Sequence, residues 1–236
     1  MSIYLWTEDR ENKAGYTFWK HMMNCLYPDI IVESKQNNIG LLKAVKKLVK
    51  SDTPDDKYII AMDESFDNDQ VVREMRALKR VISGNTNIYV LKLISFEYIL
   101  LSFTKLLDWI YAENDEFRKK RVVEISAREA ILAAIEEGRD YKSLAELKQF
   151  TSDVDNYNIE QLVSKLLFKL TRNTGFEVSK GTLGECWRNN CCEYSTRMPD
   201  DLCGLDVERL SFIDKARTIY ECSILKPEFE RLQIGG

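Results

Sequence analysis

The feature that most constrains the fold is a short apolar run that ends in acidic residues. Residues 58–62 (Tyr-Ile-Ile-Ala-Met) carry no polar alternation, and Asp63, Glu64 and Asp67 follow them. An uninterrupted apolar run of this length is typical of a strand buried on both faces of a parallel sheet. In open α/β sheets, ligands and metals bind at the carboxyl ends of the strands. The acids at this end are therefore either helix caps or ligands of a cation.

The first half of the chain repeats this strand pattern and alternates it with helical periodicity. Branched and aromatic residues predict further strands at residues 2–7, 29–33 and 87–94. Apolar residues at helical spacing predict helices over residues 16–26, 38–49, 70–82 and 98–109. The connections are long enough for helical crossovers, so we expect an α/β fold with a mainly parallel sheet covered by helices.

The second half has almost no strand signal. Helical periodicity covers residues 116–138, 143–150, 159–171 and 207–220, and residues 175–201 are irregular. The sequence therefore predicts two domains, an α/β domain over residues 1–112 and a mostly helical domain over residues 113–236.

Composition narrows the class of protein. A net charge of −4 over 236 residues gives no global basic field, so nucleic-acid binding requires local basic groups or bridging metals. Residues 88–103 are interrupted by Lys92 and Glu97, so no membrane-spanning segment is expected. The N-terminus does not resemble an export signal, and six cysteines then indicate reduced thiols and a cytoplasmic location.

Acidic residues follow three of the predicted strands. Glu8 follows the first strand, Asp63 and Asp67 the third, and Glu97 the fourth. Parallel strands bring these ends to one edge of the sheet, and clustered carboxylates repel one another unless they bind a cation or protons. Oxygen ligands of this kind suit Mg²⁺ or Mn²⁺, which can support phosphodiester cleavage. Lys13 is placed to bind a phosphate.

These segments resemble a known family. The sequences Glu-Asp-Arg-Glu-Asn-Lys at residues 8–13 and Ala-Met-Asp-Glu-Ser-Phe-Asp-Asn at residues 61–68 are similar to the metal-binding motifs of the Toprim domain, most closely its OLD-type nuclease branch. Ser-Phe-Glu-Tyr at residues 95–98 is similar to a third segment of that branch. The resemblance covers about residues 1–110 and implies a metal-dependent nuclease acting on DNA or RNA, with a defence or toxin role.

The resemblance also implies a role for each matching residue. Glu8 would be a metal ligand or general base, Asp63 the main metal ligand and Asp67 a second ligand, while Glu97 would be an accessory ligand and Lys13 would bind phosphate. The sequence contains no ATPase motif, so a separately encoded ATPase or another protein is an expected partner.

The chain departs from the family pattern at two positions. Asp9 replaces the glycine that usually follows the glutamate, and Ser65 replaces the middle acid of the aspartate motif. Because Ser65 supplies no charged oxygen, a second hypothesis is a catalytically inactive Toprim-like scaffold that binds a partner protein.

A third hypothesis is a receiver-like signalling domain. Glu8 and Asp9 would then bind Mg²⁺, Asp63 would accept a phosphoryl group, and Ser95 would supply the hydroxyl after the fourth strand. The sequence shows no fifth strand ending in Lys-Pro, which this hypothesis requires.

The cysteines and the basic groups remain open to two interpretations each. Cys186, Cys191, Cys192 and Cys203 are either buried thiols or a structural zinc site, but the one histidine, His21, is distant in sequence. The basic residues of two predicted helices either contact a phosphate backbone or form solvated helix faces; these are residues 118–121 and Arg73, Arg76, Lys79 and Arg80.

Overall fold

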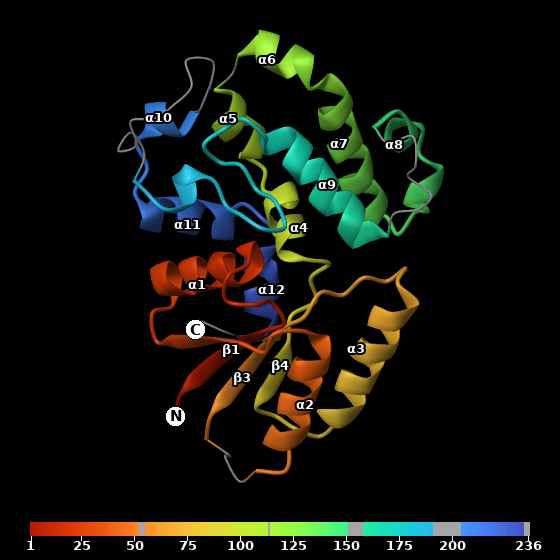
Figure 1. Cartoon of the computed structure of the whole chain (residues 1–236), viewed down its shortest axis with the longest axis vertical. Helices are drawn as coiled ribbons and strands as arrows, with labels where there is room; N and C mark the ends of the chain where they lie inside the picture. The colour runs from red at the N-terminus through yellow and green to blue at the C-terminus, as the bar shows by residue number, and fades with distance from the viewer. Residues whose placement is uncertain (52–54, 113, 151–157, 191–203, 234–236) are drawn as a thin grey trace.

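The computed structural model describes residues 1–51, 55–112, 114–150, 158–190 and 204–233. Its centre is a sheet of four parallel strands in the order β2-β1-β3-β4 (Figure 1). The strands are β1 (Ile3–Thr7), β2 (Ile30–Ser34), β3 (Lys57–Ala61) and β4 (Ile88–Val90). The predicted α/β fold with a parallel sheet is therefore confirmed.

The topology places a crevice between the ends of β1 and β3. Thr7, the last residue of β1, pairs with Ser34 of β2 and with Ala61 of β3. From β1 the chain crosses outward to β2, whereas from β3 it crosses in the opposite direction to β4. Adjacent strands whose connections diverge leave a crevice at their carboxyl ends, where ligands bind in folds of this kind.

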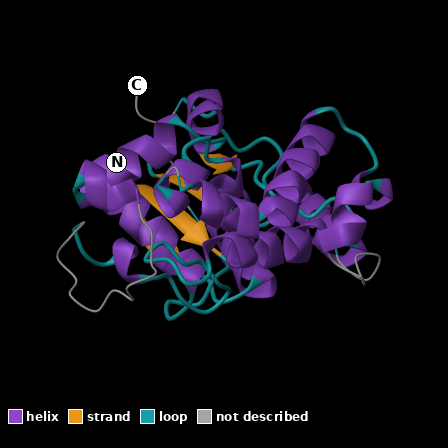
Figure 2. Cartoon of the chain, turned by 90° about the horizontal axis from the view of Figure 1, so that it is seen from above, coloured by secondary structure: helices purple, strands orange, loops and turns teal. Residues whose placement is uncertain are grey.

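Helices lie on both faces of the sheet (Figure 2), and alternate residues of the strands bury their side chains against the helices of opposite faces. Leu5 and Ile59 face the core that contains α1 (Ala14–Leu26). Trp6 and Ile60 face the core that contains the helices α2 (Asn38–Leu48) and α3 (Asp69–Val81). Burial of both faces explains the uninterrupted apolar pattern of the central strand.

Side-chain caps fix the starts of the two helices on this second face. The Asn37 side chain accepts a hydrogen bond from the backbone nitrogen of Gly40, and Asn68 caps α3 by accepting from the backbone nitrogens of Gln70 and Val71. A Cβ at Gly40 would lie 2.1 Å from the carbonyl oxygen of Lys35, so the β2–α2 turn requires glycine there.

Most of the remaining helices belong to the second half of the chain and lie above the sheet in Figure 1. They are α4 (Phe96–Ser102), α5 (Leu106–Tyr111), α6 (Asp115–Lys120), α7 (Val122–Glu136), α8 (Ala145–Phe150), α9 (Ile159–Thr171), α10 (Gly204–Glu208), α11 (Phe212–Glu221) and α12 (Leu225–Arg231), with short 3-10 turns η1 (Tyr141–Ser143) and η3 (Glu185–Trp187). A helical second half was predicted, and the described residues confirm it.

Three predicted helices have different bounds. The helix predicted over residues 98–109 is divided into α4 and α5, because the buried Arg128 side chain donates hydrogen bonds of 2.8 and 2.9 Å to the carbonyls of Leu101 and Phe103. The helix predicted over residues 116–138 is interrupted at Arg121, whose backbone has φ −121° and ψ 16°. The last predicted helix begins at Phe212, not at residue 207, and α12 follows it.

The C-terminal helix α12 packs against the sheet. The ring of Phe229 stacks on that of Tyr27 at 5.6 Å, and the Glu228 carboxylate accepts a hydrogen bond of 2.5 Å from the backbone nitrogen of Lys92. One continuous set of buried hydrophobic side chains extends from Leu5 through α7 and α9 to Phe229. The helical part therefore shares its hydrophobic core with the sheet.

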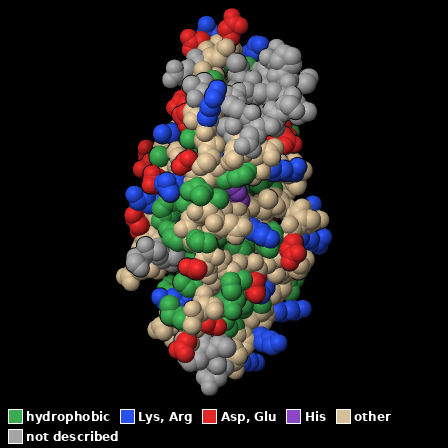
Figure 3. Space-filling model, turned by 90° about the vertical axis from the view of Figure 1, so that its left-hand side faces the viewer, with side chains coloured by type: hydrophobic (Ala, Val, Ile, Leu, Met, Phe, Trp, Pro, Cys, Tyr) green, Lys and Arg blue, Asp and Glu red, His purple; other side chains and the backbone are tan. Residues whose placement is uncertain are grey.

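The surface is mixed in charge. Figure 3 shows one side of the molecule, where Lys and Arg side chains are interspersed with Asp and Glu and with hydrophobic side chains. Among the helices of the described ranges, none has the length and apolar character needed to cross a membrane.

Candidate functional site

A cavity of about 520 Å³ opens at the carboxyl ends of β1 and β3. Four of the residues predicted from the sequence line it: Glu8, Lys13, Asp63 and Glu97. They come from the β1–α1 loop, the β3–α3 loop and the first turn of α4, so residues separated by almost ninety positions converge at the crevice between the two central strands.

Glu8 is held against the end of the neighbouring strand. Its Oε1 atom accepts a hydrogen bond of 2.9 Å from the backbone nitrogen of Asp63. Burial raises the pKa of Glu8 to about 8, although this hydrogen bond acts in the opposite direction, and the nearby charge of Asp9 raises it further. Near neutral pH this carboxyl group can therefore hold or release a proton.

Asp63 lies within electrostatic reach of several other acids. Burial raises the pKa of Asp63 well above its ordinary value, and the charges of Glu8, Glu97 and Glu160 raise it further. Burial and like charges both disfavour the ionised form of this group, whereas a bound cation would favour it.

Glu97 is the most buried acid of the cavity, with 5% of its surface exposed. It lies in the first turn of α4, where the Ser95 hydroxyl caps the helix by accepting from the backbone nitrogen of Tyr98 at 3.3 Å. Burial raises the pKa of Glu97 to about 7, while hydrogen bonds from its own backbone and from the Ser95 and Ser164 side chains lower it. These contacts fix the orientation of the carboxyl group.

Glu160 is a further acid of the cavity and, like Glu74, was not predicted from the sequence. It lies in the first turn of α9, lines the cavity, and its charge raises the pKa values of Glu8, Asp63 and Glu97. Lys180 lies 3.5 Å from its Oε1 atom. In the sequence, an acid that follows a capping asparagine indicates only the start of a helix. Glu160 reaches the cavity because of how the helical half packs against the sheet, which the local sequence does not indicate.

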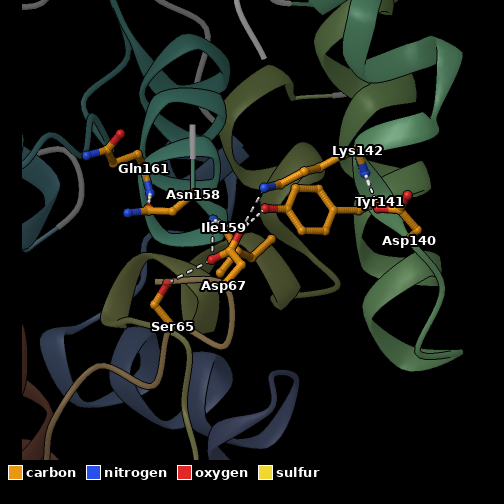
Figure 4. A network of polar contacts seen from close by, with 8 residues as sticks. All are labelled: Ser65, Asp67, Asp140, Tyr141, Lys142, Asn158, Ile159 and Gln161. Atoms are coloured by element: carbon orange, nitrogen blue, oxygen red, sulfur yellow. Dashed lines mark hydrogen bonds and ion pairs between the residues drawn. The ribbon is translucent and has the colours of Figure 1, made fainter. Parts of the chain in front are cut away.

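Asp67 does not line this cavity and belongs to a separate network of polar contacts (Figure 4). Its carboxylate accepts hydrogen bonds from the Ser65 hydroxyl at 3.1 Å, from the Tyr141 hydroxyl, and from the backbone nitrogen of Ile159 at 3.1 Å. Lys142 lies 3.9 Å from the same carboxylate. The structure therefore does not bring Asp67 together with Glu8 and Asp63, but uses it to join the β3–α3 loop to the start of α9.

The structure shows how Asp9 and Ser65 are accommodated at their positions. The Asp9 carboxylate accepts a hydrogen bond of 3.0 Å from the Thr7 hydroxyl and lies against Gly15, where a Cβ would approach its Oδ2 atom to 2.2 Å. Ser65 is 1% exposed and donates to Asp67. Asp9 is thus accommodated by a glycine elsewhere, and Ser65 supports the Asp67 network.

Basic side chains lie at the rim of the cavity. Arg10 and Lys13 are exposed and line it, and neither forms an ion pair with another described residue. Lys13 immediately precedes α1, whose first turn contains no acidic residue. These cations and the amino end of the helix are suited to binding a phosphate group.

The acids of the cavity are the residues that could hold a divalent ion. Among the described residues, no group of three or more His, Cys, Asp or Glu side chains is arranged to hold a metal ion. Mg²⁺ is usually held by one or two carboxylates, with waters and substrate phosphates as its other ligands. Glu8 and Asp63, whose charges repel each other, provide such a pair, with Glu97 and Glu160 adding negative charge around it.

The other candidate residues lie away from the cavity. His21 contacts the rings of Trp187 and Phe212 at 6.0 and 5.7 Å, and burial lowers its pKa to about 4, so it is unsuited to act as a general base at neutral pH. Cys186 is buried, whereas the predicted zinc site also needs Cys191, Cys192 and Cys203, which lie outside the described residues.

The predicted basic groups are partly neutralised. Arg118 forms a 2.6 Å ion pair with Asp108, and Lys79 forms one with Glu64 at the same distance. The receiver hypothesis requires a fifth strand, but no strand beyond β4 joins the sheet in the part of the chain that is described.

Comparisons with protein-family models, curated proteins and solved structures give no significant match. The fold and the site define a doubly wound α/β protein with a carboxylate-lined cavity at its topological switch point. Its function is therefore argued from the chemistry of this cavity.

Proposed function

We propose that this protein is a Mg²⁺- or Mn²⁺-dependent nuclease that hydrolyses phosphodiester bonds of DNA or RNA. The observation that supports this proposal best is the convergence of Glu8, Asp63 and Glu97 in one cavity at the switch point, with the pKa of each carboxyl group raised. Burying acids together is costly unless the site binds a cation.

Glu8 and Asp63 would hold the ion, with Glu97 and Glu160 as outer acids. A bound divalent ion would neutralise phosphate charge and activate water for attack on phosphorus. Glu8 would act either as a ligand of the ion or as the general base that accepts a proton from water, because a carboxylate that ligates a cation has a lowered pKa and is a poor base. Its hydrogen bond from the backbone of Asp63 keeps the carboxylate in one position in either role.

The rim cations would bind the substrate backbone. Arg10 and Lys13 lie beside the acids and have no competing ion pair among the described residues. Because the protein carries a net charge of −4, such local contacts, and not a general basic field, would bring nucleic acid to the cavity. A partner protein, such as a separately encoded ATPase, would add to these contacts.

A catalytically inactive scaffold is the second candidate. It is favoured by Ser65, which replaces an acid of the motif, and by Asp67, whose carboxylate is occupied by contacts to Tyr141 and Ile159. A scaffold does not need an ionisable group at position 63, so it should tolerate Asp63→Asn, whereas a nuclease should lose its activity.

A cleavage assay tests the proposal. Single- and double-stranded DNA and RNA are incubated with the protein in Mn²⁺, in Mg²⁺ and in a metal chelator. Metal-dependent cleavage is expected, and Asp63→Asn and Glu8→Gln should each reduce the rate at least about a hundredfold. Glu11→Gln is a matched control, because Glu11 is an exposed acid of the same loop that does not line the cavity. Cleavage that survives Asp63→Asn would contradict the assignment.

A further inference from the structure

A second cavity, of about 660 Å³, lies between α3 and the end of α7. Its inner wall contains the buried apolar side chains of Met75, Leu93 and Ile94, and Ala134 and Ile135 close it from the helical half. Val71 lines this cavity and also the carboxylate cavity, so the two are neighbours on either side of the β3–α3 loop. Its volume is typical of sites for small organic ligands.

The polar residues around this cavity are mainly cations. Arg76, Lys79, Lys92 and Arg139 line it, and Glu64 is the one acid among the lining residues. Lys79 pairs with Glu64 at 2.6 Å, and Arg139 pairs with the exposed Glu137 at 2.7 Å. Arg76 and Lys92 are exposed and form no side-chain ion pair with any described residue. The cavity therefore offers two uncompensated positive charges beside an apolar wall.

An exposed aromatic ring stands at the edge of the same cavity. Phe66 is 53% exposed, although it lines the cavity. Its ring meets that of Tyr141 edge-on, with the centroids 6.1 Å apart, and the Tyr141 hydroxyl is bound by Asp67. The ring is therefore held in place by a residue that is itself fixed, while much of its surface stays open for stacking.

We infer that this cavity binds a nucleoside phosphate, with the base against Phe66 and the apolar wall and the phosphate on Arg76 and Lys92. Bases of every kind stack on aromatic side chains, and arginine binds phosphate oxygens in a bidentate manner. A simple fatty anion would use the apolar wall and a cation but would gain little from a fixed aromatic ring. The base and phosphate belong either to a free nucleotide or to a nucleic-acid strand.

The test uses AMP and a fluorescent ten-nucleotide single-stranded DNA, with binding measured in a metal chelator so that no metal ion in the carboxylate cavity contributes, and the variants below separate this cavity from the rim cations of the other. Both cavity variants, Phe66→Ala and Arg76→Gln, change exposed side chains and should fold normally. Arg73→Gln is the matched control, because Arg73 is an exposed arginine one turn earlier on α3 that does not line the cavity. Decanoate serves as the simple apolar anion.

The inference predicts saturable AMP binding that each cavity variant weakens about tenfold and that Arg73→Gln leaves unchanged. If the same variants weaken DNA binding, the ligand is a base of a strand; if they weaken only AMP binding, the ligand is a free nucleotide. Absence of AMP and DNA binding, binding that is insensitive to both variants, or a preference for decanoate would overturn the inference. Because no metal is present, the result is independent of whether the protein cleaves nucleic acid.

Discussion

At the scale of single residues, burial decides which ionisable groups change their behaviour. Glu8 and Glu97 have raised pKa values because they are desolvated among other acids, whereas His21 has a lowered pKa because it is enclosed by aromatic rings and faces the charge of Lys215. Both effects disfavour the charged form of the group. Glu8 and Glu97 lie in the cavity and His21 does not, so His21 affects stability and not the proposed chemistry.

His21 should make the folded state sensitive to mild acid. Its pKa is about 4 in the folded protein and about 6.5 in the unfolded chain, so the unfolded state binds the proton first as the pH falls. The stability that a neutral His21 contributes is complete above about pH 6.5 and is lost as the pH falls toward about 4. Between about pH 7 and pH 4.5, the wild type should lose about 2 kcal/mol more than His21→Gln.

Urea unfolding of both proteins at the two pH values measures this difference. Comparing the two chains removes the contributions of the acids, whose raised pKa values act in the opposite direction. An equal loss in the wild type and in His21→Gln would show that His21 titrates normally.

A residue of the cavity could be predicted from the sequence where a short acidic segment directly follows a recognisable strand. Glu8 and Asp63 directly follow adjacent parallel strands, and Glu97 follows β4 in the first turn of the next helix, so the order of the strands brings all three to one edge of the sheet. Asp67 follows the same strand as Asp63, but residue spacing does not determine the direction of a side chain within a loop. The Asp67 carboxylate hydrogen-bonds Tyr141 and Ile159 and does not line the cavity. Glu160 could not be found because its place depends on a contact between distant halves of the chain.

At the scale of elements, Asp67 is the connection between the β3–α3 loop and α9. It accepts from the first backbone nitrogen of α9, Ile159, and the next residue of that helix is Glu160. Negative charge near the amino end of a helix is favourable, so the position of Asp67 supports the start of α9. The same contact fixes the helix turn that carries an acid into the carboxylate cavity.

Removing the Tyr141 hydroxyl should therefore weaken this connection. Tyr141→Phe leaves the partly buried Asp67 carboxylate without one donor, and a loss of about 1–2 kcal/mol in the free energy of unfolding is expected. Tyr16→Phe is the control, because no described residue hydrogen-bonds the Tyr16 hydroxyl. Equal stability of both variants in urea unfolding would indicate that the Asp67 contact contributes little.

The predicted elements were most accurate where hydrophobic periodicity is undisturbed. The helices α1, α2, α3 and α9 lie within one or two residues of their predicted starts. The predicted fourth strand is shortened to β4 because residues 91–94 leave the ladder while keeping two backbone hydrogen bonds to the β3 side, between Leu91 and Ile60 and between Glu64 and Leu93. Breaks such as that between α4 and α5 depend on a distant residue, Arg128, and so escape any local pattern.

At the scale of the whole molecule, one hydrophobic core joins the sheet to the helical half. The chain returns from α11 to α12, and Phe229 packs on Tyr27 beside the sheet. The helical half therefore forms part of the wall of both cavities: α9 contributes Glu160 to one, and α7 contributes Ala134 and Ile135 to the other. The site described above belongs to the complete fold and not to the first 112 residues alone.

Calorimetric titration with Mn²⁺ at about pH 8 tests the central claim most directly, because the carboxyl groups of the cavity must lose their protons to bind a cation. We expect saturable binding by the wild type and by Glu11→Gln, and its loss in Asp63→Asn. The measured binding heat should also depend on the ionisation enthalpy of the buffer, because the buffer takes up the protons that the carboxyl groups release. An Asp63→Asn protein that binds Mn²⁺ as tightly as the wild type, or a wild type that does not bind it, would contradict a metal site at the ends of β1 and β3.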